Sequence, residues 1–293
     1  MLFVRVLWVL ISVSMLAGCG GGSGGSGGGS NAEDTGTNPS NLPALTQTSP
    51  QSIPDSSFDP VTDTALNYLN YLRGYVQLPA YVENATLLQS ANAHVDYALH
   101  HNVTGHNENP ANTLYFTGVT PHDRTKAAGY LWPEVSENIS YNEDNFVGLI
   151  DNLMTAVYHR MGLLDFEKDE IGIAYKQVAV PNRDQDPLWS TLVTNAGVSG
   201  LNALCNAGGD GGQSNYMLCD DGTKISTTRY QSELDNLTQK APDMVVWPAA
   251  NSTVPPVFYE ESPDPLPDCS VSGNPVSVQV NPAKLADYTL LPE

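Results

Sequence analysis

The sequence has few basic residues: 12 lysines and arginines stand against 32 aspartates and glutamates, which leaves a formal net charge of -20. Proteins that bind nucleic acid neutralise its phosphates with basic side chains, so this balance argues against nucleic acid as a partner. The same charge would repel an anionic membrane surface. Any attachment to a membrane must therefore come from another feature of the chain.

Long apolar runs are also scarce, and the clearest one lies at the N-terminus. Residues 1–19 carry one basic residue, Arg5, within a run of Leu, Val, Ile and Trp that is too short to span a bilayer stably. The run ends in Leu16-Ala17-Gly18-Cys19, which resembles a bacterial lipobox. We expect a lipoprotein signal peptide with Cys19 as the lipid attachment site, and an ordinary signal peptide is the alternative.

The residue after this cysteine indicates which membrane the lipoprotein would be sorted to. Acyl chains on Cys19 would anchor the protein by burying CH₂ groups, each worth about 0.8 kcal/mol. Gly20 does not resemble the aspartate that retains Gram-negative lipoproteins at the inner membrane. We therefore expect an exported, membrane-anchored protein at the outer membrane or cell surface.

The segment after the signal peptide lacks any apolar periodicity. Residues 20–30 are almost entirely glycine and serine, and the polar composition continues to residue 58. Such a composition is typical of a flexible tether. The sequence thus predicts four parts: a signal peptide at 1–19, a tether at 20–58, a main domain at 59–240 and a β-rich segment at 241–293.

The chain has only four cysteines, and two of them flank a glycine-rich loop. Export to an oxidising compartment makes a disulfide between Cys205 and Cys219 the expected outcome. The Cys-x-x-Cys spacing of a structural zinc site is absent. Cys269 has no evident partner.

Periodicity in the main domain predicts both helices and strands. A helix is expected from Asp59-Pro60 to Gly74 and another from Asn84 to Leu99. One further helix, continuous from 146 to 161, has a buried apolar face with His159 at its edge. The strands expected here include a short one at 133–141 and a hairpin through Pro181-Asn182, made of residues 170–178 and 187–194. Together they predict a layered α+β domain.

Several short motifs resemble the bacterial branch of the CAP superfamily, which includes the cysteine-rich secretory, antigen 5 and pathogenesis-related 1 proteins. The resemblance covers about 59–197 and is carried by segments in the same order and spacing: Thr104–Glu108, Asp123-Arg124 with Gly129-Tyr130, Ser136–Ile139, Leu153–Leu164 and Glu170–Ile173. It implies a three-layer α-β-α sandwich with a cavity lined by two histidines and up to two glutamates. By the family pattern these are His106, Glu137 and His159, whereas Ala156 stands at the second glutamate position.

Two imidazoles and one carboxylate suit zinc or another divalent cation, with a coordination position left open for water. A metal-dependent hydrolase is one alternative. From residue 59 onward, however, the sequence has neither Gly-x-Ser-x-Gly nor His-Glu-x-x-His, so we favour binding over catalysis. A buried hydrogen-bond network formed by the same three residues is the other interpretation.

A binding module without metal is a further hypothesis. Family members are associated with sterol, fatty-acid or protein binding, and Phe116, Trp132 and Tyr158 are candidates to line a groove for a lipid, a sterol or a cell-surface protein. A structural surface domain without a small ligand is the third alternative. The segment 241–293 resembles part of an immunoglobulin-like module, which is abbreviated, packs against the first domain, or continues beyond the given sequence.

Overall fold

A computed structural model describes most of the main domain and parts of the C-terminal segment. The described residues are 64–179, 187–250, 252–254, 257–258, 267–268 and 271–287. The expected signal peptide, the tether, Cys19 and Cys269 lie outside them. Over the described ranges, no helix is both long and apolar enough to cross a membrane.

A four-stranded sheet forms the centre of the fold, with the strand order β1-β3-β4-β2. Its members are β1 (Val82–Glu83), β2 (Ser136–Tyr141), β3 (Glu170–Gln177) and β4 (Ser190–Gly197). Strands β3 and β4 pair antiparallel along their whole length, which confirms the expected pairing of these two strands. The connection expected at Pro181-Asn182 lies outside the described residues. Strand β2 pairs antiparallel with β4, and β1 pairs parallel with β3.

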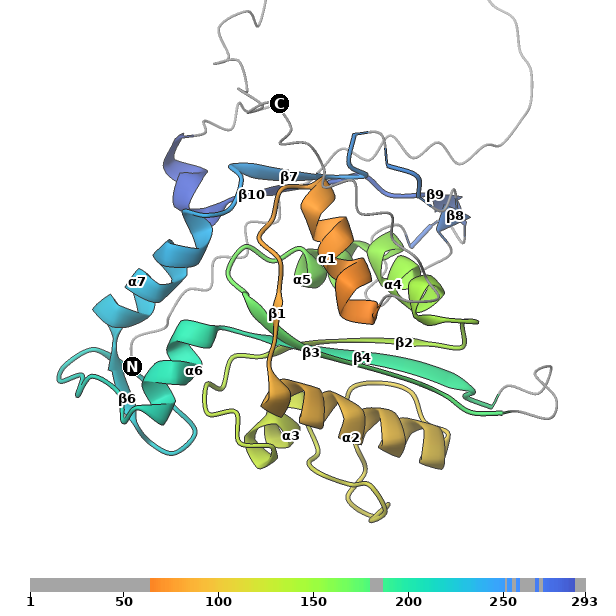
Figure 1. Cartoon of the computed structure of the whole chain (residues 1–293), viewed down its shortest axis with the longest axis horizontal. Helices are drawn as coiled ribbons and strands as arrows, with labels where there is room; N and C mark the ends of the chain where they lie inside the picture. Colours follow the sequence, from red (N-terminus) through yellow and green to blue (C-terminus); the bar gives the residue numbers. More distant parts are fainter. Residues whose placement is uncertain are drawn as a thin grey trace, which may run out of the picture.

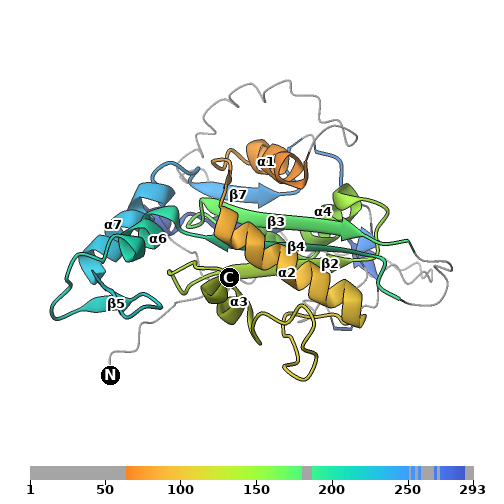
Figure 2. The same ribbon diagram turned by 60° about the horizontal axis from the view of Figure 1, so that its bottom comes forward.

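Helices cover both faces of this sheet, as Figure 1 shows. One face carries α2 (Ala85–His101) and α3 (Pro121–Ala127), and Figure 2 shows α2 lying along the sheet. The opposite face carries α1 (Ala65–Tyr75), α4 (Phe146–Thr155) and α5 (Val157–Leu163). The α+β class and the three-layer α-β-α sandwich are therefore confirmed.

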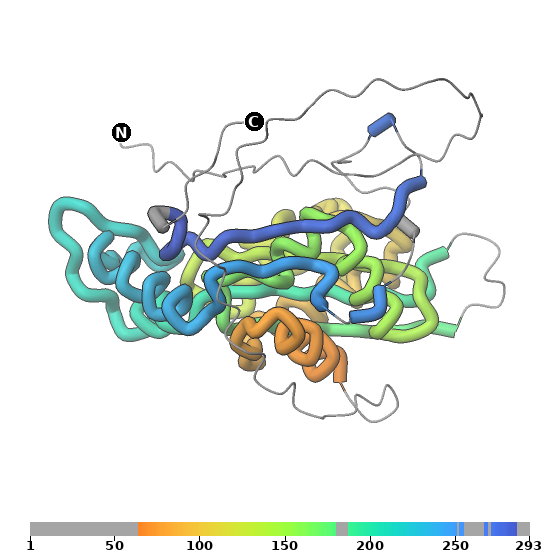
Figure 3. The backbone as a smooth tube through the Cα atoms, turned by 90° about the horizontal axis from the view of Figure 1, so that it is seen from above, coloured from red at the N-terminus to blue at the C-terminus, as the bar shows by residue number. Residues whose placement is uncertain are grey.

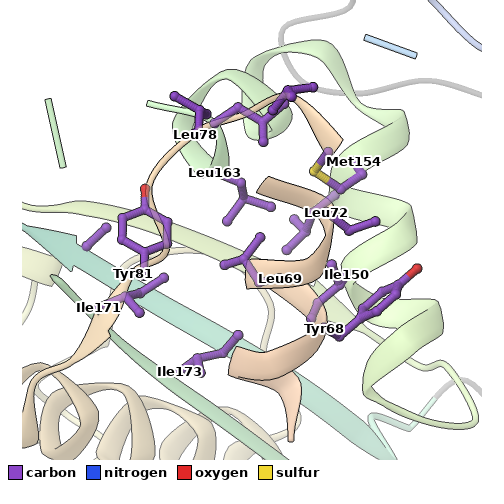
Figure 4. Packing of buried hydrophobic residues seen from close by; sticks show 14 of the residues in the cluster. Tyr68, Leu69, Leu72, Leu78, Tyr81, Ile150, Met154, Leu163, Ile171 and Ile173 are labelled. Carbon is purple, nitrogen blue, oxygen red and sulfur yellow. The ribbon is translucent and has the colours of Figure 1, made fainter. Parts of the chain in front are cut away.

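The largest apolar cluster lies between the sheet and the α1 and α4 helices (Figure 4). Leu69 of α1 and Ile171 of β3 are completely buried there, and Ile150 of α4 packs in the same cluster. Burial of one such aliphatic side chain stabilises the fold by about 1.5–3 kcal/mol. The periodic apolar residues of the two helices are thus the part of the sequence that fixes this layer.

The first two helices begin at capping side chains. Thr64 Oγ1 accepts a hydrogen bond from Asn67 N, so α1 begins after Thr64, and the cap expected at Asp59 lies outside the described residues. Asn84 Oδ1 accepts from Thr86 N at 2.9 Å and Leu87 N at 3.1 Å, which confirms the predicted start of α2.

The buried carboxylate of Glu170 ties this helix start to the sheet. Its Oε2 accepts a hydrogen bond from Asn84 Nδ2 at 2.8 Å, and its Oε1 accepts one from the Tyr130 hydroxyl at 2.7 Å. Burial raises the pKa of Glu170, although these two hydrogen bonds partly oppose the shift. The folded protein therefore favours the protonated form more than the unfolded chain does.

A stability measurement against pH tests this statement. Because the folded pKa of Glu170 is raised, its stabilising contribution is complete below the ordinary carboxyl pKa and is lost as pH rises through the raised value. We expect the stability of the wild type relative to Glu170→Gln to fall in denaturant unfolding as the pH rises above about 4.5, the ordinary pKa of a glutamate carboxyl. The exposed Glu83→Gln variant is the control. A difference that rises with pH would contradict the prediction.

The prediction of one uninterrupted helix from 146 to 161 is wrong. The chain forms two helices there, with Ala156 between them in an extended conformation (φ -76°, ψ 123°). Alanine favours helix, so nothing local signals the break. The change of direction instead follows from packing, because both Leu153 in α4 and Leu163 in α5 are buried in the same apolar cluster.

The described part of the C-terminal segment packs against the first domain. Strand β7 (Met244–Trp247) pairs antiparallel with β10 (Ser277–Val280), and the two run side by side in Figure 3. Val245 and Trp247 are buried in the apolar cluster of α1 and α4. The side chain of Arg160 also reaches this segment, because its Nη2 donates to the Pro275 carbonyl at 2.9 Å. Packing against the first domain is thus the alternative that the structure bears out.

The remaining elements of the segment are short. Strand β8 (Val257–Phe258) pairs antiparallel with β9 (Ser272–Gly273), and a 3-10 helix, η1, spans Pro282–Asp287. Resemblance of the segment to an immunoglobulin-like module stays a prediction.

A disulfide-closed unit stands at one end of the sheet. It consists of α6 (Ser199–Asn206), β5 (Tyr216–Leu218), β6 (Lys224–Ser226) and α7 (Thr227–Thr238). Cys205 and Cys219 are bonded, with 5.7 Å between their Cα atoms, which confirms the predicted disulfide. Both cysteines are buried in an apolar cluster that includes Trp132.

Candidate functional site

The candidate site lies on the sheet face that carries α2 and α3. Helix α2 ends at Asn102, which has a left-handed conformation (φ 53°, ψ 51°), and the chain then forms a long loop to Thr120. His106 lies in this loop. Glu137 lies on β2 and is two residues from Ile139, which packs against α2, so the two side chains point to the same face of the sheet.

His106 and Glu137 are in direct contact. The distance from His106 Nδ1 to Glu137 Oε1 is 3.0 Å. The histidine side chain is 48% exposed, whereas the glutamate side chain is only 1% exposed. A carboxylate oxygen accepts the bond, so Nδ1 carries a proton in this contact and Nε2 is the ring nitrogen that the contact leaves available. The pair therefore places one oriented, accessible nitrogen at the surface.

Arg124 holds the other oxygen of Glu137. Its Nη2 donates to Glu137 Oε2 at 2.6 Å, and its Nη1 donates to the main-chain carbonyl of His106 at 2.9 Å. The arginine side chain has no exposed surface. Charge-assisted bonds of this kind are stronger than neutral ones, so they hold the Glu137 side chain in place.

The start of α3 determines where Arg124 lies. Thr120 and Asp123 form a reciprocal capping box, with Pro121 at the first helical position. Hydrogen bonds from the main chain and side chain of Thr120 lower the pKa of Asp123. The cap fixes the start of the helix, and from this helix Arg124 reaches Glu137 on β2.

A second buried pair lies behind the first one. His94 Nδ1 is 2.9 Å from Glu108 Oε1, and His94 Nε2 is 3.1 Å from the Gly105 carbonyl oxygen. A carbonyl only accepts, so Nε2 carries a proton, and one further proton is shared between Nδ1 and the carboxyl group. Glu108 Oε2 also accepts from Thr117 N at 2.9 Å. This pair therefore contacts the loop that contains His106 at two points, Gly105 and Thr117.

The two pairs meet at Arg124, whose Nε lies 3.7 Å from Glu108 Oε1. His94, Glu108 and Arg124 were given no role from the sequence. Asp123-Arg124 belonged to the family resemblance, and His94 shared the apolar face of its helix, but neither pattern indicated a charged partner. Of the network interpreted from the sequence, the structure shows the contact between His106 and Glu137. A network that includes His159 stays a prediction.

Tyr141 adds a hydroxyl beside the loop. Its oxygen accepts a hydrogen bond from Gly105 N at 2.7 Å, next to His106 in the chain. Burial raises the pKa of Tyr141 to about 12, so the phenol stays protonated at neutral pH. The hydroxyl serves to fix the main chain just before His106.

His159 lies on α5, on the other face of the sheet (Figure 1). Where this helix crosses β2, Gly162 faces Asn138, the strand residue that points away from Glu137. Within residues 64–179, 187–250 and the shorter described stretches, no three or more His, Cys, Asp or Glu side chains are arranged to hold a metal ion. The structure thus brings His106 and Glu137 together, and the three-residue metal site stays a prediction.

The three aromatic candidates for a groove lie in different environments. Trp132 is completely buried and contacts Tyr230, so it belongs to the core. Phe116 is half-buried in the loop, and Tyr158 on α5 is 38% exposed. Trp132 therefore does not line a surface groove, contrary to the expectation, and a groove formed by Phe116 or Tyr158 stays a prediction.

Comparisons with known proteins show what this chain is similar to. Residues 66–183 match the model of the CAP family, described as the cysteine-rich secretory protein family. An extracellular protein with an SCP domain from Bacillus anthracis is 17% identical (TM-score 0.36) over 45% of this chain and 38% of that one. An outer surface protein from Borrelia burgdorferi is 14% identical (TM-score 0.37) over 45% of this chain and 87% of that one.

This chain therefore spans well under two thirds of the Bacillus protein. No curated protein matches the chain. The match over residues 66–183 covers less than half of the chain, and in this region the chain is similar to the CAP, or cysteine-rich secretory protein, family.

Proposed function

We propose that this chain is an exported, lipid-anchored CAP-domain protein that binds a divalent cation through His106. His159 as a second ligand is supported by the family resemblance alone, because α5 lies on the other face of the sheet. Zinc is the favoured ion. The proposal of an anchor is supported by Leu16-Ala17-Gly18-Cys19 at the end of the N-terminal apolar run. The proposed activity is binding, and no chemical step is assigned to the site.

One observation carries the proposal: the 3.0 Å contact between His106 Nδ1 and the buried carboxylate of Glu137. Histidines that bind metals usually donate their other ring N–H to a carboxylate or a carbonyl, which sets the tautomer and the ring orientation. The pair already has this arrangement, and the imidazole is 48% exposed. The Nε2 lone pair is thus presented to solvent in the form that a metal requires.

The contacts of Glu137 revise the role expected for it. Both of its oxygens are engaged, one by His106 and one by Arg124, and the side chain is only 1% exposed. We therefore assign it to the support of His106 instead of direct coordination. Imidazole nitrogen suits zinc, copper and nickel, whereas magnesium and calcium prefer oxygen ligands. The negative charge of the chain favours cation binding in general.

Zinc titration of the purified full-length chain in detergent, followed by calorimetry, tests the proposal. We expect one zinc site in the wild type and at least about tenfold weaker binding in His106→Ala. His100→Ala is the matched control, because His100 is an exposed histidine at the end of α2 that packs on Tyr115. Absence of zinc binding to the wild type would reject the proposal, and unchanged binding in His159→Ala would reject the second ligand.

An apolar ligand is a second candidate. The loop that carries His106 also exposes three apolar side chains: Leu114 (51%), Tyr115 (47%) and Val119 (40%). Exposed apolar groups beside a polar centre are typical of surfaces that take lipids or proteins. Binding of a fluorescent fatty acid or sterol that persists in the presence of a chelator, and in His106→Ala, would favour this candidate over the metal site.

A further inference from the structure

We propose that Arg124 is the positioning residue of the site, because it fixes both the main chain and the ring of His106. This inference rests on the proposed function, in which His106 Nε2 is the binding atom. Arg124 itself is completely buried and does not reach a ligand at the surface. Its effect on binding therefore acts only through His106 and Glu137.

Three hydrogen bonds join these residues into a closed ring. Arg124 Nη1 donates to the His106 carbonyl at 2.9 Å, and Nη2 donates to Glu137 Oε2 at 2.6 Å. Glu137 Oε1 then accepts from His106 Nδ1 at 3.0 Å. The ring contains the backbone and the imidazole of the same residue. A shift of the loop or a rotation of the imidazole must therefore break at least one of the three bonds.

The geometry requires arginine at this position. A guanidinium has two NH₂ groups in a fixed plane, so it can hold a carbonyl and a carboxylate at the same time. A lysine ammonium is a compact point charge on a flexible stem and lacks this fork. Lysine would preserve the charge beside Glu137 but not the simultaneous contact with the His106 carbonyl.

The surroundings of Arg124 leave it little freedom to move. The capping box of Thr120 and Asp123 fixes the first turn of α3. Gly118 packs so closely on this turn that an added Cβ would lie 2.6 Å from the Asp123 Cβ and 2.9 Å from Arg124 N. Glu108 lies on the other side of the guanidinium, with its Oε1 3.7 Å from Arg124 Nε. The positioning group is thus itself held from three directions.

The test is Arg124→Lys in the full-length protein, measured by imidazole nitrogen NMR and by zinc titration. In the wild type we expect His106 to be in the Nδ1–H tautomer. In Arg124→Lys we expect a mixture of tautomers and about 10- to 100-fold weaker zinc binding. The control is Arg73→Lys, since Arg73 is also buried and donates to three carbonyl groups, those of Pro79, Leu163 and Asp165. That variant should leave the His106 signals unchanged.

The outcomes separate this inference from the proposed function. A wild-type tautomer that is lost in Arg124→Lys supports the positioning role even where zinc fails to bind to either protein. An unchanged tautomer together with unchanged zinc affinity in Arg124→Lys overturns it. Should Arg124→Lys not fold, Glu137→Gln provides the second variant, because one amide oxygen cannot accept from both Arg124 and His106. Retention of the Nδ1–H tautomer and the wild-type affinity in Glu137→Gln then overturns the inference.

Discussion

Replacement of Arg124 by methionine is expected to lower the free energy of unfolding by about 3–5 kcal/mol. The side chains of Glu108 and Glu137 are 0% and 1% exposed, and Arg124 is the cation that lies between them. Methionine fills a similar volume but has no charge. Two buried carboxylates would then lose the arginine that they share, and each would keep its contact with a histidine.

Denaturant unfolding at neutral pH measures this loss. The matched control is Arg229→Met, in which an arginine that is 50% exposed loses its ion pair with Glu233 on α7. Exposed pairs of this type contribute about 0.2–1 kcal/mol. We also expect the double variant Arg124→Met with Glu137→Gln to be more stable than Arg124→Met alone, because it removes one uncompensated charge. A loss below about 1 kcal/mol in Arg124→Met would show that the buried charges are not coupled in this way.

The second large effect is expected at Gly172, where a change to alanine should cost about 3 kcal/mol or more. A Cβ atom at this position would lie 2.0 Å from Leu88 N and 2.1 Å from Leu87 C. Both atoms belong to the backbone of the first turn of α2, so no side-chain rotation can relieve the clash. Helix α2 would have to move away from β3, and His94 would move with it.

Gly74→Ala is the matched control for this prediction. Gly74 lies in the last turn of α1, and an added Cβ would have no atom within 4 Å. Alanine there should stabilise the protein by about 0.5–1 kcal/mol, because it reduces the freedom of the unfolded chain and favours helix. The prediction fails if the two variants unfold at the same denaturant concentration. It also fails if Gly172→Ala is the more stable of the two variants.

Much of the fold follows from short stretches of sequence. The cap at Asn84, the box of Thr120 and Asp123 and the apolar alternation of β2 each depend on residues within a few positions of one another. The wrong prediction of a continuous helix through Ala156 has a non-local cause. Its neighbours form a continuous helical pattern, but burial of Leu153 and Leu163 in one cluster favours two helices with a change of direction between them.

In the candidate site, too, some residues could be predicted from the sequence and others became apparent only in the structure. His106 and Glu137 were predicted through their family motifs, and the structure places them in contact. Their common partner Arg124 and the pair of His94 with Glu108 were not predicted. Composition suggested a chain poor in cations, yet one of its few arginines lies, completely buried, between two carboxylates.

The physical reason is the range of the interactions. Periodicity, capping and disulfide spacing are properties of neighbouring residues, so the sequence was sufficient for the α+β layers, for most element starts and for the Cys205–Cys219 bond. A buried charge instead needs a partner brought close by the fold. The bonds from Glu137 to His106 and to Arg124 join positions 31 and 13 residues apart, and their geometry exists only after α2, α3 and β2 have packed together.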